Sequence, residues 1–403
     1  MKQVKNENLI NRLDRILEIL LDVFIFVIPI SIGAINVLVG VLFLLLLARI
    51  ILKRDYVLTE GILNKGIILF LFLILISAFF AGKDYERTLY AFVSPVLKYV
   101  VMYYLVINLI KDNNSFNKSI RIYWVAQIIG AIYAVYLHFI AGVARARGFT
   151  HNPNRLGSTM MFFIIFNFAM LIFDRNKKVK IFSAVGVFLG FLGLFSTLSR
   201  SALISTLIGL AVVCLLKDKR FIVLFLIASL LLFVILPDDY MARLELLKDI
   251  ESTNVSQRLL LYKIGIKLFK KYPITGIGFN AVRGIYDRFD MEEFKELKNT
   301  YGHLHNVFIN VAVEMGIIGL VMFLYLLYII LKKSWLLFKK TNHGFVAGIL
   351  GILFGQIFQN TVDMNFQGTE VGLIFVFLIA LMLVFEEKES EFMDKGIYGS
   401  PVN

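Results

Sequence analysis

The chain contains 403 residues and carries a formal net charge of +13, with 59% hydrophobic and 18% charged residues. Soluble domains contain roughly 45–50% apolar residues, and transmembrane β-barrels alternate apolar and polar positions, so the long unbroken apolar runs exclude both classes. The basic residues lie mainly in short segments between these runs, which argues against a nucleic-acid-binding surface, and the chain is predicted to be an all-α polytopic membrane protein.

Twelve stretches are long and apolar enough to cross a bilayer, for which a helix needs about 20 residues. Their predicted ranges are 16–33, 35–52, 63–81, 88–110, 120–142, 157–173, 181–197, 201–216, 220–236, 306–331, 344–362 and 370–385. Asp22 interrupts the first span. One helical face is shared by Leu9, Ile10, Leu13, Ile16, Leu17 and Leu20, which predicts an amphipathic helix lying on the membrane.

The distribution of lysine and arginine predicts the orientation of these helices. With the N-terminus placed in the cytoplasm, the inside segments carry 24 basic residues and the short outside loops carry 6. Cytoplasmic loops of membrane proteins carry such an excess. We therefore predict helices one to nine in residues 1–236, a large periplasmic loop with short helices in 237–305, helices ten to twelve in 306–385, and a cytoplasmic tail in 386–403.

Two of the short outside segments carry unusual polar residues. Residues 145–155 contain three arginines, no acid and an Asn-Pro-Asn turn signal. They form either a membrane-surface loop on lipid phosphates or the rim of an anion site. Arg200 lies between two spans that almost touch, where an arginine is costly unless it is paired. It either snorkels to the surface or serves a site, and the adjacent Ser199 hydroxyl is placed to bind the same anion.

The large loop contributes two further candidates on the same predicted side. Residues 256–271 form a predicted helix with a lysine stripe, and Arg258 projects on the opposite, apolar side. It points either into a site or into solvent at the helix start. His305 precedes helix ten and is either a helix-capping residue or a proton acceptor, because histidine titrates near neutral pH.

The sequence shows no pattern typical of a nucleotide or metal site. Residues 276–280 hold a glycine pair without the third glycine of a dinucleotide loop. His303 and His305 have no nearby set of cysteine, histidine or acidic ligands. The single cysteine, Cys214, excludes an intramolecular disulfide. We expect neither a metal nor a cofactor.

Four stretches of the chain resemble the O-antigen ligase and polymerase superfamily of bacterial inner membranes. His305-Asn306 is followed by nine residues and then by Gly316-Ile-Ile-Gly319, which is similar to the ligase pattern His-Asn-x9-Gly-x-x-Gly at the end of the large periplasmic loop. The other stretches are Arg147-Gly-Phe-Thr-His-Asn-Pro-Asn, Thr197-Leu-Ser-Arg-Ser, and Ser256-Gln-Arg258 followed by Tyr272-Pro-Ile-Thr-Gly-Ile-Gly278.

The resemblance implies an inverting glycosyltransferase of the inner membrane whose active site faces the periplasm among membrane lipids. Its donor would be a glycan on undecaprenyl diphosphate, its acceptor a lipid A–core sugar or another glycan, and it would need neither metal nor nucleotide. Arg200 and Arg258 would hold the diphosphate, and His305 would take the acceptor proton. Supporting roles in substrate binding fall to Arg147, His151, Asn152, Ser199, Asn306 and Glu314.

Two other functions remain compatible with the sequence. A polymerase of the same superfamily shares the donor and the chemistry, and only the chain length and the His-Asn-x9-Gly-x-x-Gly match favour a ligase. A transporter of lipid-linked glycan also fits twelve helices. The absence of a visible repeat and the position of the ionisable residues at the outer rim argue against it, although Lys98 lies within a span.

Overall fold

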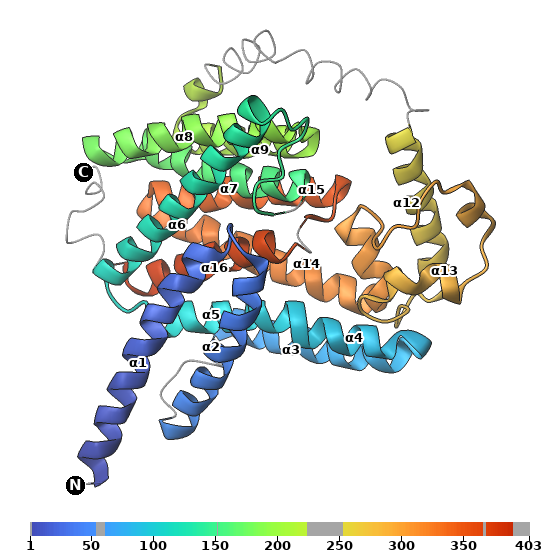
Figure 1. Cartoon of the computed structure of the whole chain (residues 1–403), viewed down its shortest axis with the longest axis horizontal. Helices are drawn as coiled ribbons and strands as arrows, with labels where there is room; N and C mark the ends of the chain where they lie inside the picture. The colour runs from blue at the N-terminus through green and yellow to red at the C-terminus, as the bar shows by residue number, and fades with distance from the viewer. Residues whose placement is uncertain (1, 54–60, 151, 224–252, 366–367, 390–403) are drawn as a thin grey trace.

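The computed structural model describes residues 2–53, 61–150, 152–223, 253–365 and 368–389. These residues form an all-α protein with fourteen α-helices (Figure 1). Ten helical segments are long and apolar enough to cross a membrane, judged by their length and composition. The prediction of an all-α polytopic membrane protein is confirmed.

The long helices follow the predicted spans closely. Their bounds are α1 Lys2–Val27, α2 Ile32–Leu52, α3 Gly61–Ser77, α4 Tyr85–Ala91, α5 Leu97–Leu109, α6 Asn113–Val135, α7 Pro153–Phe173, α8 Lys177–Thr197, α9 Arg200–Lys217, α14 Val307–Thr341, α15 Gly344–Val362 and α16 Thr369–Glu387. A π-helical turn that contains Pro95 joins α4 to α5, so the two form one span. The predicted ninth span, 220–236, lies mainly outside the described residues, as do 237–252 and most of the tail.

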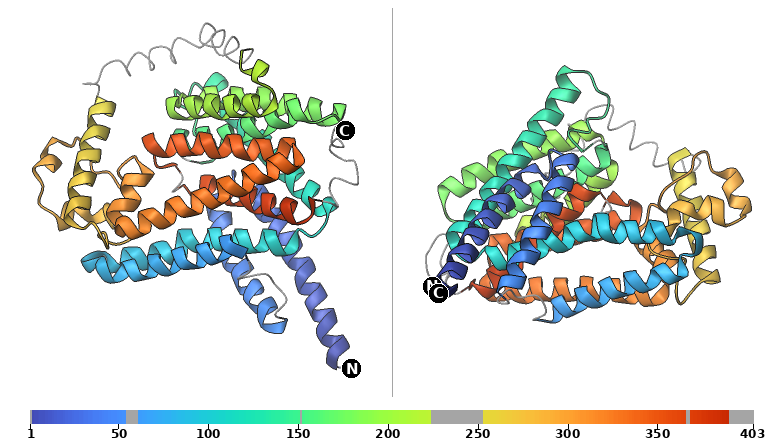
Figure 2. Two further views of the ribbon diagram at one scale, coloured as in Figure 1. Left: turned by 180° about the vertical axis from the view of Figure 1, so that it is seen from behind. Right: turned by 60° about the horizontal axis from the view of Figure 1, so that its bottom comes forward.

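The first predicted span differs from the structure. Residues 16–33 do not form a separate span, because α1 is a single helix from Lys2 to Val27 and is not among the ten candidate spans. No proline or glycine interrupts it. Two of its acids are paired with other helices, Asp14 with Arg49 of α2 at 2.6 Å and Asp22 with Lys118 of α6. Figure 1 and Figure 2 show α1 and α2 leaving the bundle at a steep angle to α7 and α8.

Helix α7 forms the centre of the bundle. It packs against α8, α9 and α15, and all side chains of residues 160–165 are fully buried. Glycines allow the closest contacts, as in the crossing of α9 and α15, where a Cβ on Gly209 would lie 2.8 Å from the backbone oxygen of Gly351. Small residues at such crossings let helix backbones approach, which stabilises helix pairs inside a membrane.

A smaller unit stands at one end of the bundle. It comprises α12 Thr253–Lys271, α13 Ile285–Arg288 and the turns between them and α14 (Figure 1). Its own apolar core is formed by Leu261, Ile264, Leu268, Ile277, Val282, Ile285 and Leu304. This unit corresponds to the described part of the predicted large loop.

Helix α14 contains a break that fastens this unit to the bundle. Ten residues after the cap Asn306, Gly316 adopts φ 65° and ψ −167°, which no helix accommodates. The segment 273–278 fills the break: Ile277 and Gly278 donate their backbone N–H groups to the carbonyls of Val313 and Glu314, both at 2.9 Å, and Ile317 donates to Pro273 at 2.8 Å. The backbone groups that the break would leave unpaired are thereby satisfied.

We predict that Gly316→Ala destabilises the protein by at least about 2 kcal/mol, because alanine strains at a positive φ. The added Cβ would also lie 2.0 Å from the backbone oxygen of Ile274. Thermal unfolding of the purified protein in detergent measures the loss. Gly40→Ala is the matched control, since its Cβ would meet nothing within 4 Å. Equal midpoints for the two variants would contradict the role assigned to Gly316.

Candidate functional site

Five segments that are far apart in the sequence meet where the α12 unit adjoins the bundle. They are the loop before α7, the turn between α8 and α9, the start of α12, the residues before α14, and the end of α15. Side-chain hydrogen bonds join these segments directly. The predicted site residues fall on the first four of them, and on α14 itself.

His305 occupies a strained turn that is held on three sides. Its φ is 53°, an unusual value for a residue other than glycine. The next residue, Asn306, caps α14 by accepting a bond from the N–H of Ile309 at 3.0 Å, and it donates to the carbonyl of Thr361 at 3.0 Å. Tyr262 of α12 donates its hydroxyl to the carbonyl of His305 at 3.2 Å. The backbone at His305 is therefore held to both α12 and α15.

Asp363, which caps the end of α15, is the acidic partner of His305. Its Oδ1 lies 3.4 Å from His305 Nδ1, and the residue is only 3% exposed. Burial alone raises the pKa of this carboxyl, but contact with His305 and the positive charge of Arg258 outweigh it, so the pKa lies below its ordinary value. Asp363 is therefore a carboxylate at neutral pH, and it favours the Nδ1–H form of the His305 imidazole.

Arg258 lies beside this pair. It is half-buried, one helical turn before Tyr262 on α12, and its charge acts on both Asp363 and Tyr262. The structure thus brings Arg258 and His305 together around Asp363. This placement agrees with the expectation that Arg258 points away from the lysine stripe.

Arg200 and Ser199 lie at the start of α9, next to the loop that reaches Asp363. Ser199 is buried and precedes the helix as its cap residue, and Arg200 is half-buried at its first position. The preceding turn binds the loop before α7: Ala146 donates its N–H to the carbonyl of Ser196 at 2.8 Å. A turn with Leu198 at φ 50° sends the chain back toward the bundle.

The loop before α7 places its predicted residues differently. Arg147 is exposed, and its carbonyl accepts bonds from the backbone N–H and the hydroxyl of Thr150. Asn152 is exposed and caps α7, accepting from the N–H groups of Asn154 and Arg155. His151 lies outside the described residues. Asn154, in the first turn of α7, donates its amide to Asp363, and Arg145 of the loop donates to Asn154.

Glu314 lies on α14 near the break and is 2% exposed. Its carboxylate accepts a bond from the N–H of Val282 at 3.4 Å, and its backbone oxygen accepts one from Gly278. The side chain of Asn310 and the positive charge of Arg283 also act on this carboxyl group. These contacts tie Glu314 to the segment that fills the break, whereas the contacts of His305 run to α12 and α15.

Asp363 could not be selected from the sequence alone, although one signal pointed to it. Residues 360–365 read Asn-Thr-Val-Asp-Met-Asn, which is unusually polar for the short connection between two spans. Arg155 also could not be selected from the sequence alone. Its Nη1 lies 3.8 Å from the buried Glu370 at the start of α16. The roles of both residues depend on contacts with helices that lie far away in the sequence.

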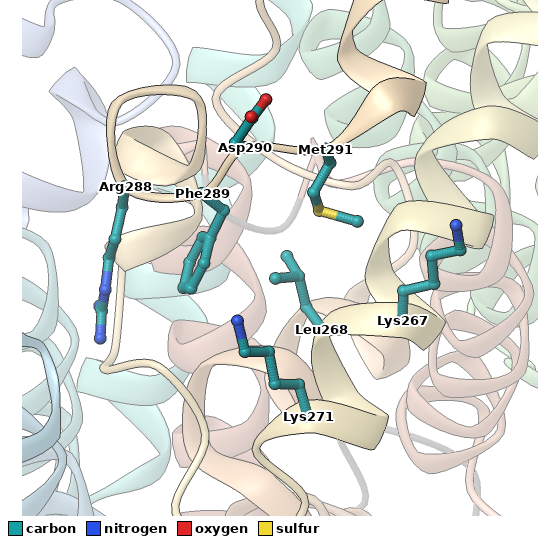
Figure 3. A pocket seen from close by; sticks show the side chains of 7 residues that line it. All are labelled: Lys267, Leu268, Lys271, Arg288, Phe289, Asp290 and Met291. Carbon is teal, nitrogen blue, oxygen red and sulfur yellow. The ribbon is translucent and has the colours of Figure 1, made fainter.

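A cavity of about 370 Å³ lies on the other side of α12 (Figure 3). Lys267, Lys271 and Leu268 of α12 and residues 288–291 line it, and the ring of Phe289 faces Leu268 across it. Lys267 follows Arg258 by nine residues, or two and a half helical turns, so the two residues lie on opposite faces of α12. The cavity is therefore separate from the His305 site. In the described part of the chain, no group of three histidine, cysteine or acidic residues is placed to hold a metal ion.

His303 is half-buried beside His305, with 4.3 Å between the ring centroids. Burial, the neighbouring His305 and the charges of Arg283 and Arg155 lower its pKa to about 4, although Asp363 acts in the opposite direction. His303 is therefore neutral across the physiological range and is not a pH-dependent charge in the site.

We predict that the His303 imidazole stays neutral from pH 8 down to pH 5 and gains its proton near pH 4, because its pKa is depressed. NMR titration of the histidine ring signals measures this value, with His303→Gln identifying the signal. A midpoint between pH 6 and 7 would contradict the depressed pKa.

Comparison with known proteins adds one finding. Residues 185–324 match the model of a protein family described as O-antigen ligase. The matched stretch contains the later part of α8, all of α9 and α12, and the first half of α14, and so includes Arg200, Arg258 and His305. No curated protein matches the chain. The resemblance to the O-antigen ligase and polymerase superfamily is confirmed over these residues, and it supports a multi-pass membrane enzyme that acts on lipid-linked glycans.

Proposed function

We propose that this protein is a glycosyltransferase that moves a preassembled glycan from undecaprenyl diphosphate to a hydroxyl of a lipid A–core sugar, as an O-antigen ligase does. The observation that carries the proposal is the pairing of His305 with the buried Asp363 beside Arg258, within the stretch that matches the family. A proton acceptor and a permanent cation then share one site, as transfer from a diphosphate requires.

The His305–Asp363 pair supplies the base. The Asp363 carboxylate, 3.4 Å from His305 Nδ1, favours the tautomer that carries its proton on Nδ1, which leaves Nε2 with a lone pair for the acceptor hydroxyl. As the hydroxyl oxygen attacks the anomeric carbon, its proton passes to Nε2 and the bond between that carbon and the diphosphate oxygen breaks. The lipid diphosphate leaves with the electron pair, and attack from the opposite face inverts the anomeric carbon.

The arginines stabilise the leaving group. Arg258 and Arg200 carry forked, permanently charged donors, which suit the oxygens of a diphosphate and replace the charge that a metal ion would otherwise supply. Arg147, His151, Asn152, Ser199 and Asn306 belong in this proposal to the surrounding substrate site. Glu314 supports the site through the segment that fills the break in α14.

We predict that His305→Ala lowers glycan transfer by about 10²- to 10⁴-fold, because the acceptor hydroxyl loses its base.

Arg200→Lys keeps the charge but loses the planar fork, and we expect glycan transfer to fall about 10-fold or more. Transfer by purified protein from lipid-diphosphate glycan to lipid A–core measures both. Wild-type turnover in His305→Ala protein of normal thermal stability would refute the assignment of the base.

Deletion of the gene separates the two enzymes of the superfamily and the transporter. A ligase is required only for the last step, so its loss leaves full-length glycan on the lipid carrier. Accumulation of single repeats identifies a polymerase instead. Movement of lipid-linked glycan across liposomes without cleavage of the diphosphate bond identifies a transporter.

The proposed site faces the periplasm, and cysteine labelling tests this orientation. In a Cys214→Ser background, Lys270→Cys on α12 should react with a membrane-impermeant maleimide in cells whose outer barrier alone is opened. Lys177→Cys at the start of α8 should react only after the inner membrane is permeabilised. Both positions are exposed, so access to the reagent depends on the side of the membrane. If Lys177→Cys reacted first and Lys270→Cys only after the inner membrane is permeabilised, the proposed orientation would be wrong.

A further inference from the structure

We propose that Arg145 and Asn154 are positioning residues that hold Asp363 as the ionised partner of His305. The inference rests on the proposed function and adds to it two residues that do not touch the reacting atoms. It is argued from a continuous chain of side-chain hydrogen bonds between the α8–α9 turn and the His305–Asp363 pair.

The first link is the Arg145 guanidinium. Its Nε donates to the carbonyl of Thr197 at 3.0 Å, and its Nη2 donates to Asn154 Oδ1 at 2.7 Å. Arginine has donors only and keeps its proton in proteins. The amide oxygen of Asn154 must therefore face Arg145, and the amide NH₂ group must face away from it.

The second link is the Asn154 amide. With its oxygen held by Arg145, its Nδ2 donates to Asp363 Oδ2 at 3.1 Å. Asn365 donates to the same oxygen at 3.3 Å, and the N–H of Met364 donates to Asp363 Oδ1 at 2.8 Å. Three N–H donors thus face one buried side chain. A carboxylate accepts all three, whereas a protonated carboxyl would place its own hydrogen against one of them.

The charge of Arg258 on α12 and the contact with His305 favour the anion of Asp363. Tyr262 of α12 and His303 before α14 also interact electrostatically with Asp363, and Arg283 and Arg155 act on the neighbouring His303. Asn154 adds the neutral donor that orients the Asp363 carboxylate, so that Oδ1 remains directed toward His305 Nδ1 at 3.4 Å.

Arg145 also connects the two halves of the proposed chemistry. Thr197, which accepts its Nε bond, lies in the turn that leads to Arg200. One guanidinium therefore fixes both the support of the base and the turn that presents a diphosphate-binding arginine. Substitution of Asn154 is expected to affect the chemical step more than donor binding, because Asn154 is not assigned to the substrate and does not hold the turn that leads to Arg200. Substitution of Arg145 is expected to affect both.

The test is Asn154→Asp, which keeps the size of the side chain and its acceptor for Arg145 but replaces the donor that faces Asp363 by a carboxylate. We expect kcat for glycan transfer to fall about 10- to 100-fold, since a hydrogen bond to a charged group is lost. The KM for lipid-diphosphate glycan should stay within about threefold. The pKa of Asp363 rises when a donor is lost, so the acid limb of the pH profile should move to higher pH.

Asn117→Asp is the matched control. Asn117 donates its amide to Asn113 at the opposite end of the bundle and should leave kcat and the pH profile unchanged. Arg145→Leu should reproduce the kcat loss and the moved acid limb, and Arg145→Lys should restore part of the rate. An Asn154→Asp enzyme with wild-type kcat and an unmoved acid limb overturns the positioning role. A wild-type protein that transfers no glycan overturns the proposed function instead.

Discussion

The buried carboxylate of Asp363 is the constraint around which the site is arranged. A carboxylate that is 3% exposed is costly unless every oxygen finds a donor. The protein meets this demand with groups from α7, from the connection after α15 and from the segment before α14. The requirement to satisfy one charge therefore determines how several helix ends approach one another.

The same constraint explains why the loop unit is attached so firmly. Tyr262 of α12 donates to the carbonyls of both His305 and Thr361, so α12 is joined to both helix ends that carry the His305–Asp363 pair. The segment 273–278 enters the break in α14 and satisfies its exposed carbonyls. In the proposed mechanism this attachment would hold the base in place, because small displacements of a base from its substrate cost much of the rate.

The spans were predictable because hydropathy reports directly on immersion in a bilayer, and ten of the twelve predicted ranges match candidate spans in the described residues. The start of the chain was not, since α1 owes its continuity to partners of Asp14 and Asp22 on distant helices. Likewise, residue type and predicted side of the membrane selected His305, Arg200 and Arg258. Asp363, Asn154 and Arg145 depend on hydrogen bonds between segments whose proximity only folding reveals.

The break at Gly316 gives the spacing of the His-Asn-x9-Gly motif a geometric meaning. The nine residues Val307 to Met315 form a short rigid rod between a cap bound to α15 and a kink filled by the α12 unit. Each residue added to or removed from an α-helix rotates its two ends against each other by about 100° and shifts them by about 1.5 Å. A single insertion in this rod would therefore turn the imidazole away from its carboxylate.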